Sequence, residues 1–506
     1  MSRPDHAFRA RRVGRPIRTV WILSLLASVA CAGDAPRGDS TEIPTPDVAA
    51  RIAAFESGFG PGGDAEGRPW TIAERMKEYG VPGLSLAVID DGEVAWAKGY
   101  GVLRAGAPEP VNTETVFSVG SVSKVGTAAA TLRLVDAGRL DLDRDVNELL
   151  SSWQVPPNDF DEAVTLRQIM SHTAGLTVHG FQDYQPGAEL PTTVQILEGS
   201  GPAQSPPVFV DIPPGSQFRY SGGGVTVEQL VIEEEMESDY PSAARELVFE
   251  PLGMTRSTYE NPIPVAFGNI AKAHDGEGRP RAWPRGFEAM PEAGASGLWT
   301  TPSDYAKLVI AFIESYRGVD GAFLSPGLAR DMMTEVEPGP YGLGPELAGE
   351  GAARRFSHGG ANDSYRAFMQ GNLATGDGVV IFTNGERGGA LASEALRSAA
   401  GAEGWDDALV TSPESAPIPE ESTEGVDLSP YEGTYAFEGV AEVQILARDG
   451  QLFGSVGGNE VRLRYQGEHT FVINANQSIV FLPDADPPGA EFRVGSLAIP
   501  AVRQRP

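Results

Sequence analysis

The sequence has one cysteine, Cys31, among 506 residues. A single cysteine excludes an internal disulfide and a cluster of thiolates around a metal. Histidine is also scarce, with six residues, and none of them forms the His-Glu-x-x-His pattern of a zinc hydrolase. We therefore expect neither a metal site nor a cofactor.

Positive charge is in short supply as well. Lysine and arginine together number 39 against 69 aspartate and glutamate residues, which gives a formal net charge of −30. This field repels phosphate backbones, so nucleic acid is not an expected partner. The simplest interpretation of the charge is an acidic, solvated surface. The partner that we expect is a small-molecule or peptide substrate, and no feature of the sequence indicates the oligomeric state.

The sequence lacks an apolar run long enough to span a bilayer. The apolar residues 20–30 follow five arginines within residues 9–18 and end in small residues directly before Cys31. A basic region, a short apolar region and small residues before a cut are typical of a secretory signal peptide, here residues 1–30. A cysteine at the cut resembles a bacterial lipoprotein, whereas Ser28-Val-Ala30 also suits ordinary cleavage. We expect export, as a periplasmic or cell-envelope lipoprotein with a membrane anchor on Cys31, or otherwise secretion.

Composition divides the rest of the chain into four segments. Residues 31–64 read as a polar tether and N-terminal segment, and residues 409–427 as a linker rich in proline, glutamate and serine. Between them, we expect residues 65–408 to fold as one domain. After the linker, we expect residues 428–506 to form a second, smaller domain.

The larger domain begins and ends with expected strands. Residues 84–89 and 94–100 flank the turn Asp90-Asp-Gly92 and predict a β-hairpin. Further strands are expected around Phe356 and over residues 378–383. Helical patterns lie between these ends, so we expect one sheet that joins both ends of the domain, with a helical insertion. One expected helix begins at residue 121, and others cover residues 225–236, 241–249, 301–316 and 390–400.

The smaller domain has a different pattern. Apolar and polar residues alternate with period two in short segments, and turn signals such as Asp449-Gly450 separate them. Short strands at this spacing predict a small all-β barrel or sandwich. The alternating segments include parts of residues 443–446, 461–465, 471–473 and 479–482.

The stretch Ser121-Val-Ser-Lys124 stands at the start of a predicted helix. Residues three apart share a helix face, so the hydroxyl of Ser121 and the amine of Lys124 would lie one turn apart. A desolvated lysine can lose its proton near neutral pH and accept that of the serine. The helix N-terminus also supplies N–H groups for an oxyanion. The alternative is that Ser121 only caps the helix and that Lys124 is solvated.

Tyr220 comes just before the glycine run at residues 222–224 and another predicted helix. A glycine run lets the backbone approach a ligand closely. Near a protonated lysine, a buried tyrosine would have a lowered pKa and could carry a proton. A core tyrosine beside a flexible turn is the alternative.

A third candidate stretch is His358-Gly-Gly-Ala-Asn362. Paired glycines on an edge strand let a substrate lie against the backbone, so that an N–H such as that of Ala361 can face an oxyanion. His358 adds a titratable donor, and the alternative is a structural histidine.

Three stretches together resemble the active-site motifs of the serine β-lactamase and penicillin-binding-protein superfamily. They are Ser121-Val-Ser-Lys124, Tyr220-Ser-Gly222 and His358-Gly-Gly360, in this order. The most similar branch is the class C-like one, with its esterases, D-amino-acid peptidases and D-alanyl-D-alanine carboxypeptidases. Residues 169–176 and 293–304 support the resemblance.

The resemblance covers about residues 65–400. It implies an α/β (α+β) fold in which helices flank an antiparallel sheet and a helical subdomain is added. From about residue 428 the chain is similar to the lipocalin-like β-barrel that often follows this domain, which implies a small all-β barrel.

The resemblance also implies residue roles. Ser121 would be the acylated nucleophile, Lys124 its general base, and Tyr220 the proton shuttle to the leaving group. The N–H groups of Ser121 and Ala361 would form the oxyanion hole. His358 would orient the tyrosine and the substrate. The positions expected to line the substrate are Gly222, Gly359, Gly360 and Asn362.

Two positions depart from the family pattern. Gly222 replaces a frequent asparagine, and His358 replaces a frequent lysine, so an amide and a permanent positive charge for the substrate are missing. We expect an exported serine hydrolase that cleaves an ester or amide (peptide) bond through an acyl-enzyme on Ser121. The alternatives are a true β-lactamase or D-alanyl-D-alanine carboxypeptidase, and a non-catalytic ligand-binding or sensor protein of the same fold.

Overall fold

The computed structural model describes residues 45–60, 68–160, 162–283, 286–405, 423, 426–437, 443–448, 450–456, 459–467, 469–474, 477–483, 485, 487–494 and 497–504. The predicted signal peptide, Cys31 and nearly all of the predicted linker lie outside the described residues. Within the described part of the chain, no helix is both long enough and apolar enough to cross a membrane.

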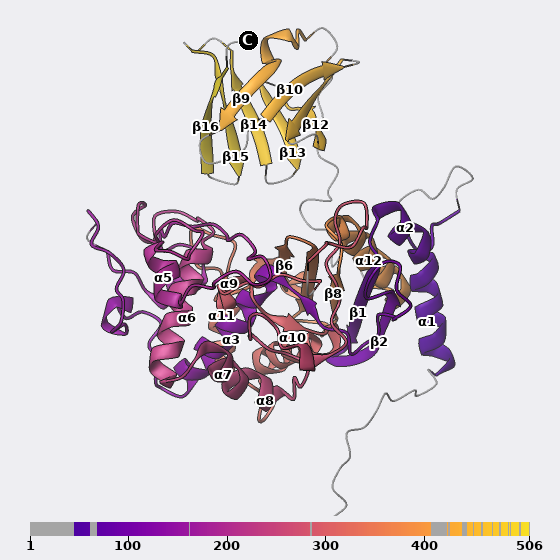
Figure 1. The fold of residues 1–506 in the computed structure, drawn as a ribbon, viewed down its shortest axis with the longest axis vertical. Helices are drawn as coiled ribbons and strands as arrows, with labels where there is room; N and C mark the ends of the chain where they lie inside the picture. Colours follow the sequence, from indigo (N-terminus) through magenta and orange to yellow (C-terminus); the bar gives the residue numbers. More distant parts are fainter. Residues whose placement is uncertain are drawn as a thin grey trace, which may run out of the picture. The chain divides into compact units, whose positions relative to one another are not determined.

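A six-stranded antiparallel sheet forms the centre of the first domain (Figure 1). In spatial order its strands are β2 (Glu93–Gly101), β1 (Gly83–Asp90), β8 (Gly378–Thr383), β7 (Tyr365–Asn372), β6 (Arg355–Asn362) and β5 (Glu346–Ala348). The expected hairpin is β1–β2, and β1 also pairs with β8, with Leu84 opposite Thr383. Both ends of the domain therefore meet in one sheet, which confirms the expected fold.

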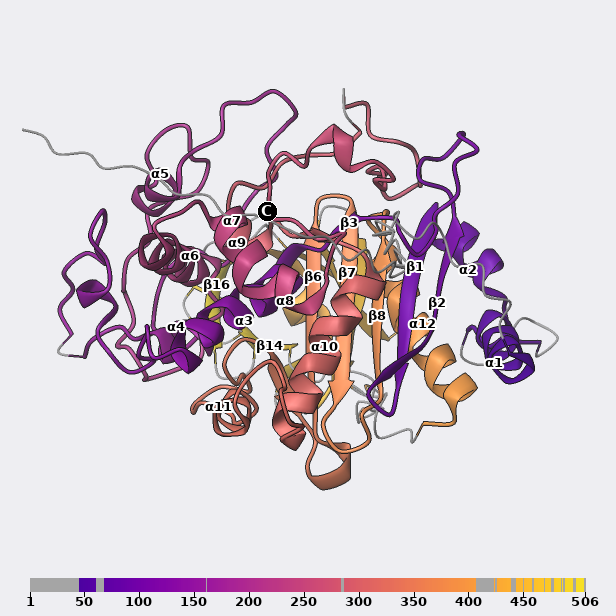
Figure 2. The same ribbon diagram turned by 90° about the horizontal axis from the view of Figure 1, so that it is seen from below.

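The two faces of the sheet are covered by different helices. On β1, Ala87 belongs to one hydrophobic core and Val88 to the other, because successive side chains of a strand point to opposite faces. On the first face, α10 (Pro302–Arg317) packs across β1, β8 and β7 (Figure 2). On the second face, α12 (Gly388–Glu403) packs on β7 and β8, and α1 (Pro46–Ser57) packs on α12.

Helix α1 lies upstream of residue 65, where we expect the domain to start from the sequence. Its Phe55 is fully buried, and the Phe55 ring centroid lies 5.3 Å from those of Phe59 and Trp96. Arg51 on the same helix pairs with Glu403 of α12 at 2.5 Å. Residues from Pro46 onward therefore contribute to the core of the first domain.

The chain between β2 and β5 forms a mostly helical part beside β6 (Figure 1). Its central helix is α3 (Ser123–Asp136), which packs against α6 and α9 and buries Lys124 together with most of its other residues. A helix surrounded on all sides thus carries an amine into the core. The other helices are α2 (Ile72–Tyr79, ahead of β1), α4 (Leu166–Met170), α5 (Thr193–Glu198), α6 (Gly222–Met236), α7 (Tyr240–Ala244), α8 (Glu250–Leu252), α9 (Ala293–Ser296) and α11 (Pro326–Met332).

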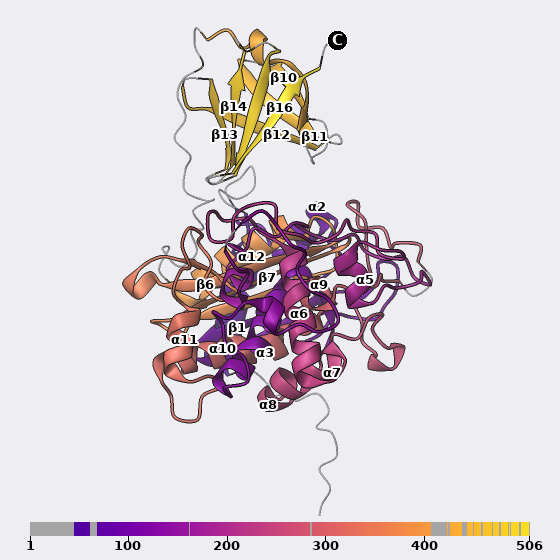
Figure 3. The same cartoon turned by 90° about the vertical axis from the view of Figure 1, so that its left-hand side faces the viewer.

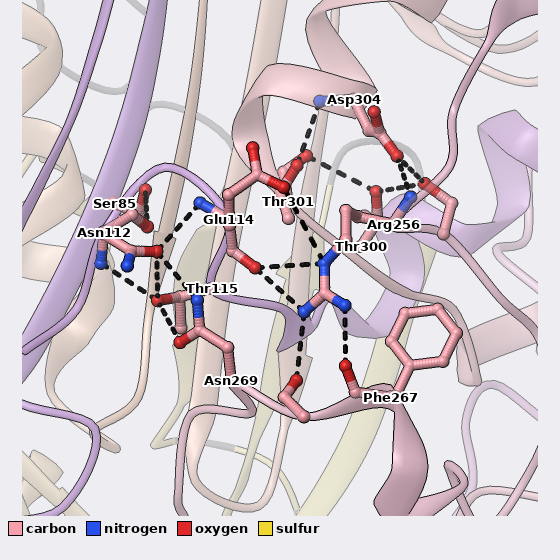
Figure 4. Close-up of polar contacts among 12 residues, drawn as sticks. Ser85, Asn112, Glu114, Thr115, Arg256, Phe267, Asn269, Thr300, Thr301 and Asp304 are labelled. Carbon is pink, nitrogen blue, oxygen red and sulfur yellow. Dashed lines mark hydrogen bonds and ion pairs between the residues drawn. The ribbon is translucent and has the colours of Figure 1, made fainter. Parts of the chain in front are cut away.

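A polar network fixes the loop that leads to the start of α3. Two short strands, β3 (Phe117–Ser118) and β4 (Trp299–Thr300), pair beside the main sheet. Just before β3, the Glu114 carbonyl oxygen accepts a hydrogen bond from Arg256 at 3.0 Å (Figure 4). The Arg256 N–H in turn donates to Asp304 Oδ2 of α10 at 2.6 Å. Arg256 therefore links the segment ahead of the Ser121 turn to α10.

The C-terminal part forms a closed barrel of eight antiparallel strands (Figure 3). In spatial order they are β10 (Val443–Arg448), β11 (Gln451–Val456), β12 (Asn459–Tyr465), β13 (Thr470–Asn474), β14 (Gln477–Leu482), β15 (Gly489–Val494), β16 (Leu497–Arg503) and β9 (Gly433–Phe437). The barrel has its own aromatic core, in which the rings of Phe471 and Phe481 lie 5.5 Å apart and Tyr431 bonds His469 at 2.7 Å. This confirms the expected small all-β barrel.

We expect Phe55→Ala to destabilise the first domain by about 3–5 kcal/mol, because the substitution removes a buried ring and leaves a cavity. Urea unfolding followed by tryptophan fluorescence measures the change. Val265, which is 71% exposed, offers the matched control, and Val265→Ala should stay within about 0.5 kcal/mol of the native protein. An unchanged midpoint for Phe55→Ala would show that α1 does not belong to this core.

Candidate active site

Ser121 lies in a tight helical turn, η1 (Gly120–Val122), that runs directly into α3. The N-cap positions of these two elements are Val119 and Val122, and neither makes a side-chain capping bond. Ser121 is therefore not a helix cap, which was the alternative interpretation of this stretch. Instead its Oγ accepts a hydrogen bond from Lys124 Nζ at 3.1 Å.

The amine of Lys124 is buried behind Ser121. Lys124 is 4% exposed, and its Nζ also donates to the carbonyl oxygen of Ala295 at 2.7 Å. Burial lowers the pKa of Lys124 to about 7, against a smaller opposing effect of the Glu228 carboxyl. Near neutral pH, a large share of Lys124 is thus the free amine that a general base requires.

Tyr220 completes a group of three polar side chains. Its phenol shares a hydrogen bond with the Ser121 hydroxyl, and Lys124 Nζ lies 5.0 Å from the centroid of its ring. From the sequence we expect a lowered pKa for Tyr220, and this expectation is wrong. Burial raises the Tyr220 pKa above its ordinary value, because desolvation of the phenolate outweighs the bond from Ser121. Tyr220 therefore holds its proton and can give it away.

The segment after Tyr220 is fixed by the start of α6. The Ser221 Oγ accepts from the Gly224 N–H at 2.8 Å, and the Gly222 N–H donates to the His179 carbonyl oxygen at 3.1 Å. A Cβ at Gly222 would lie 3.0 Å from the ring of Phe181. Phe181 thus crowds the space that a side chain at position 222 would need. An apolar ring therefore lies beside the position where the family frequently has an asparagine amide.

Two histidines outside the three motifs contact Tyr220. The ring of His172 lies 4.2 Å from that of Tyr220, and its Nδ1 accepts the Ser221 N–H at 3.3 Å. The ring of His179 lies 5.1 Å from that of Tyr220. Burial lowers the pKa of both histidines, and the charge of Lys124 lowers it further. His172 stands within residues 169–176, but the sequence alone does not separate a histidine that holds a tyrosine from a core histidine.

His358 reaches the same group from β6. Its ring lies 6.2 Å from that of Tyr220, and its Nδ1 contacts the Gly359 carbonyl oxygen at 2.6 Å. Because a carbonyl oxygen only accepts, Nδ1 carries the proton and Nε2 presents a lone pair. This Nε2 is buried and has no hydrogen-bond partner. Burial lowers the pKa of His358 to about 4, so the imidazole is neutral.

Glycines bring β6 against the turn that carries Ser121. Among the described residues, β5 pairs with β6 only through Arg355–Ser357, which leaves the later part of β6 without a β5 neighbour. A Cβ at Gly360 would lie 3.1 Å from the Ser121 nitrogen, and a Cβ at Gly120 would lie 2.5 Å from the Ala361 nitrogen. Only glycines permit this approach, which sets the backbone nitrogens of Ser121 and Ala361 close together, as an oxyanion hole requires.

The remaining expected substrate positions differ in their surroundings. A Cβ at Gly359 would meet nothing within 4 Å, so this glycine borders open space. The amide of Asn362, in contrast, forms hydrogen bonds with other side chains of the protein. Its Nδ2 donates to Ser118 Oγ at 2.7 Å, and its Oδ1 accepts from Ser296 Oγ at 2.8 Å. Asn362 thus ties β6 to β3 and α9.

In the described part of the chain, no group of three histidine, cysteine, aspartate or glutamate side chains is arranged to hold a metal ion. The site can act through its own residues: a hydroxyl, a free amine, a protonated phenol and two backbone N–H groups meet at one place. This set suits transfer of an acyl group to Ser121.

Comparison with known proteins adds a sequence and a structural context. The family model described as Beta-lactamase matches residues 71–403. Penicillin-binding protein 4 of Amycolatopsis lactamdurans is 28% identical over 381 residues, which are 72% of this chain and 95% of that protein.

Two solved structures resemble this one. SurE with D-Leu has a TM-score of 0.59 at 22% sequence identity, over 90% of this chain and 100% of that chain. The D-amino acid amidase from Ochrobactrum anthropi SV3, complexed with D-phenylalanine, has a TM-score of 0.55 at 20% identity, over 70% and 99% of the two chains. At these identities the likeness concerns the fold.

The lowered pKa of Lys124 predicts a pH dependence for the reactivity of Ser121. If the free amine takes the serine proton, the rate at which a fluorophosphonate labels Ser121 should rise about tenfold per pH unit up to about pH 7 and then level off. Lys124→Arg should abolish the labelling, since a guanidinium stays protonated. Lys77→Arg, at an exposed position, is the control. A labelling rate that still rises tenfold per unit at pH 9 would contradict the role of Lys124.

Proposed function

The chain belongs to the beta-lactamase family of serine hydrolases, and from this premise we propose that it cleaves an ester or amide bond through an acyl-enzyme on Ser121. The observation that carries the proposal is the contact of Ser121 Oγ with Lys124 Nζ at 3.1 Å beside the phenol of Tyr220. A serine activated by a buried amine is a nucleophile.

In the first half of the reaction, Ser121 Oγ attacks the substrate carbonyl and its proton passes to the free amine of Lys124. The carbonyl oxygen takes on negative charge, which the N–H groups of Ser121 and Ala361 stabilise. Tyr220 then donates its proton to the leaving group as the carbonyl–leaving-group bond breaks, and the proton on Lys124 restores the phenol. The product of this half is an ester on Ser121 and a free alcohol or amine.

In the second half, a water molecule attacks the ester carbonyl. Its proton passes through Tyr220 to Lys124, and the Ser121 oxygen leaves with a proton from the same pair, which restores the starting state. The ring of His172 and the Ser221 N–H on its Nδ1 hold Tyr220 in place for both steps. Tyr220 and Lys124 therefore carry the proton in both halves of the reaction.

Ester or peptide substrates are favoured over β-lactams. The position of Gly222 is crowded by Phe181, so no amide is available there for a substrate carbonyl. His358 is neutral, so it offers no permanent positive charge for a substrate carboxylate. The name of one similar protein of known structure, a D-amino acid amidase, supports an amide of a D-amino acid as a candidate substrate.

We expect the native protein to hydrolyse p-nitrophenyl butyrate over many turnovers, with kcat/KM lowered about 1,000-fold or more in Ser121→Ala, because the nucleophile is lost. Mass spectrometry should find the acyl adduct on Ser121. Ser393→Ala, at an exposed position on α12, is the control and should retain the native rate.

Equal fluorophosphonate labelling of the native protein and Ser121→Ala would contradict the proposal. A single stoichiometric acylation without turnover would favour the alternative, a ligand-binding or sensor protein of the same fold. Turnover of a chromogenic cephalosporin at rates typical of enzymes would instead favour a true β-lactamase.

A further inference from the structure

Five carboxyl side chains gather beyond the end of β6, and we refer to them as the acidic cluster. They come from chain segments far apart in the sequence and are Asp183, Glu288, Glu292, Asp363 and Glu386. Asp183 Oδ2 accepts the Asp363 N–H at 2.5 Å, and Asp183 and Asp363 are the acidic neighbours that face Glu288. Asp183 also faces Glu292, and Arg281 joins Glu386 to Asp363, so the five carboxyls form one connected group.

The two innermost members of the acidic cluster have unused oxygen atoms. Glu288 is 2% exposed, and neither of its carboxyl oxygens has a hydrogen-bond partner. Glu292 is 1% exposed, and its Oε2 has no partner either. A buried carboxyl without a partner is costly, so each such group in a folded protein calls for an explanation.

The two arginines near the acidic cluster bond its outer members or backbone oxygens, and not its innermost members. Arg281 pairs with Glu386 and, at 3.1 Å, with Asp363. Arg366 donates to the carbonyl oxygens of Asn362 at 2.6 Å and Tyr365 at 2.7 Å. Five carboxyls therefore face two guanidinium groups, and Glu288 and Glu292 receive no hydrogen bond from either arginine.

The acidic cluster adjoins the candidate active site through two short stretches of chain. Glu292 directly precedes α9, and one turn later the Ala295 carbonyl oxygen accepts from Lys124. One helical turn advances only about 5 Å along the axis. On the other side, Asp363 follows Asn362, the last residue of the strand that brings Ala361 to Ser121.

The acidic cluster is also open toward solvent on one side. The side chain of Asp363 is 39% exposed and that of Glu386 is 30% exposed, whereas Glu288 and Glu292 lie deeper. A ligand group that enters past Asp363 would meet carboxyl oxygens that have no other partner.

The buried members of the acidic cluster bind protons more tightly than ordinary carboxyls do. Burial raises the pKa of Asp183 to about 7 and that of Glu292 to about 8, and it raises the pKa of Glu288 well above its ordinary value. A cation placed among the carboxyls would favour their ionised forms and would release those protons.

We propose that the acidic cluster binds an ammonium group of the substrate, so that the protein prefers esters or amides that carry a free amine. This inference rests on the proposed function, because it places a substrate at Ser121. An ammonium has three N–H donors and no acceptor, so it matches the unpartnered carboxyl oxygens of Glu288 and Glu292 once these carboxyls are ionised. A metal ion fits less well, because no three acidic side chains of the described residues stand at coordinating positions.

The test compares matched substrates that differ only by one charge. D-phenylalanine p-nitroanilide and 6-aminohexanoate p-nitrophenyl ester carry an ammonium, and their N-acetyl derivatives do not. The charged member of at least one pair should be favoured about tenfold or more in kcat/KM. In the double variant Glu288→Gln/Glu292→Gln this preference should fall to about one, while the rates on the N-acetyl substrates stay within about threefold. Glu189→Gln, at an exposed position on a nearby stretch of chain, removes one carboxylate outside the acidic cluster and should leave the preference unchanged.

A binding experiment separates failure of this inference from failure of the proposed function. Ser121→Ala protein is titrated by calorimetry with D-phenylalaninamide and with its N-acetyl derivative, with and without the double substitution. Binding of the charged compound alone, lost in the double variant, supports the inference even if nothing is hydrolysed. Equal binding of both compounds, no binding of either, or tighter binding of Ca²⁺ alone at the same residues overturns it. Should the double variant unfold, Asp183→Asn replaces it in both experiments.

Discussion

The contact between the buried amine of Lys124 and the hydroxyl of Ser121 is the interaction on which the site depends. Burial lowers the pKa of Lys124 to about 7, so the folded protein favours the free amine more than the unfolded chain does. The pKa of Lys124 is lower in the folded protein than in the unfolded chain. Lys124 therefore lowers the free energy of unfolding, and this loss of stability grows as the pH falls from the unfolded pKa to the folded pKa of about 7. The bond from Nζ to the Ala295 carbonyl oxygen and the packing of α3 offset this cost. The fold thus keeps an unfavourable group in place where it is reactive.

The rest of the domain positions the groups around Ser121 and Lys124. The sheet joins the two ends of the domain and presents β6 at its side, where glycines let the Ala361 nitrogen approach that of Ser121. Helix α6 begins directly after Tyr220 and fixes its backbone, while His172 packs on its ring. Burial then sets opposite protonation states: it favours the free amine of Lys124 and the protonated phenol of Tyr220. A proton acceptor and a proton donor therefore stand on either side of one hydroxyl.

Local sequence patterns predicted the parts of this account that depend on neighbours in the chain. The spacing of Ser121 and Lys124 on one helix face, the hairpin that became β1–β2 and the period-two segments of the barrel are of this kind. The sign of the Tyr220 pKa shift was not predicted, because it depends on how deeply the ring is buried. The acidic cluster was missed for a related reason: Asp183, Glu288 and Asp363 are remote in sequence and meet only in the folded chain. The crowding of Gly222 by Phe181 was missed for the same reason, because these two residues meet only in the folded chain.

A direct measurement of the protonation of Lys124 tests the central claim. The chain has only five lysines, so labelling with ¹³Cε-lysine gives a spectrum simple enough to follow each signal with pH. We predict that one signal titrates with a midpoint near pH 7 and that this signal disappears in Lys124→Arg. If no lysine signal titrates near pH 7, Lys124 is protonated at neutral pH and cannot be the base that activates Ser121.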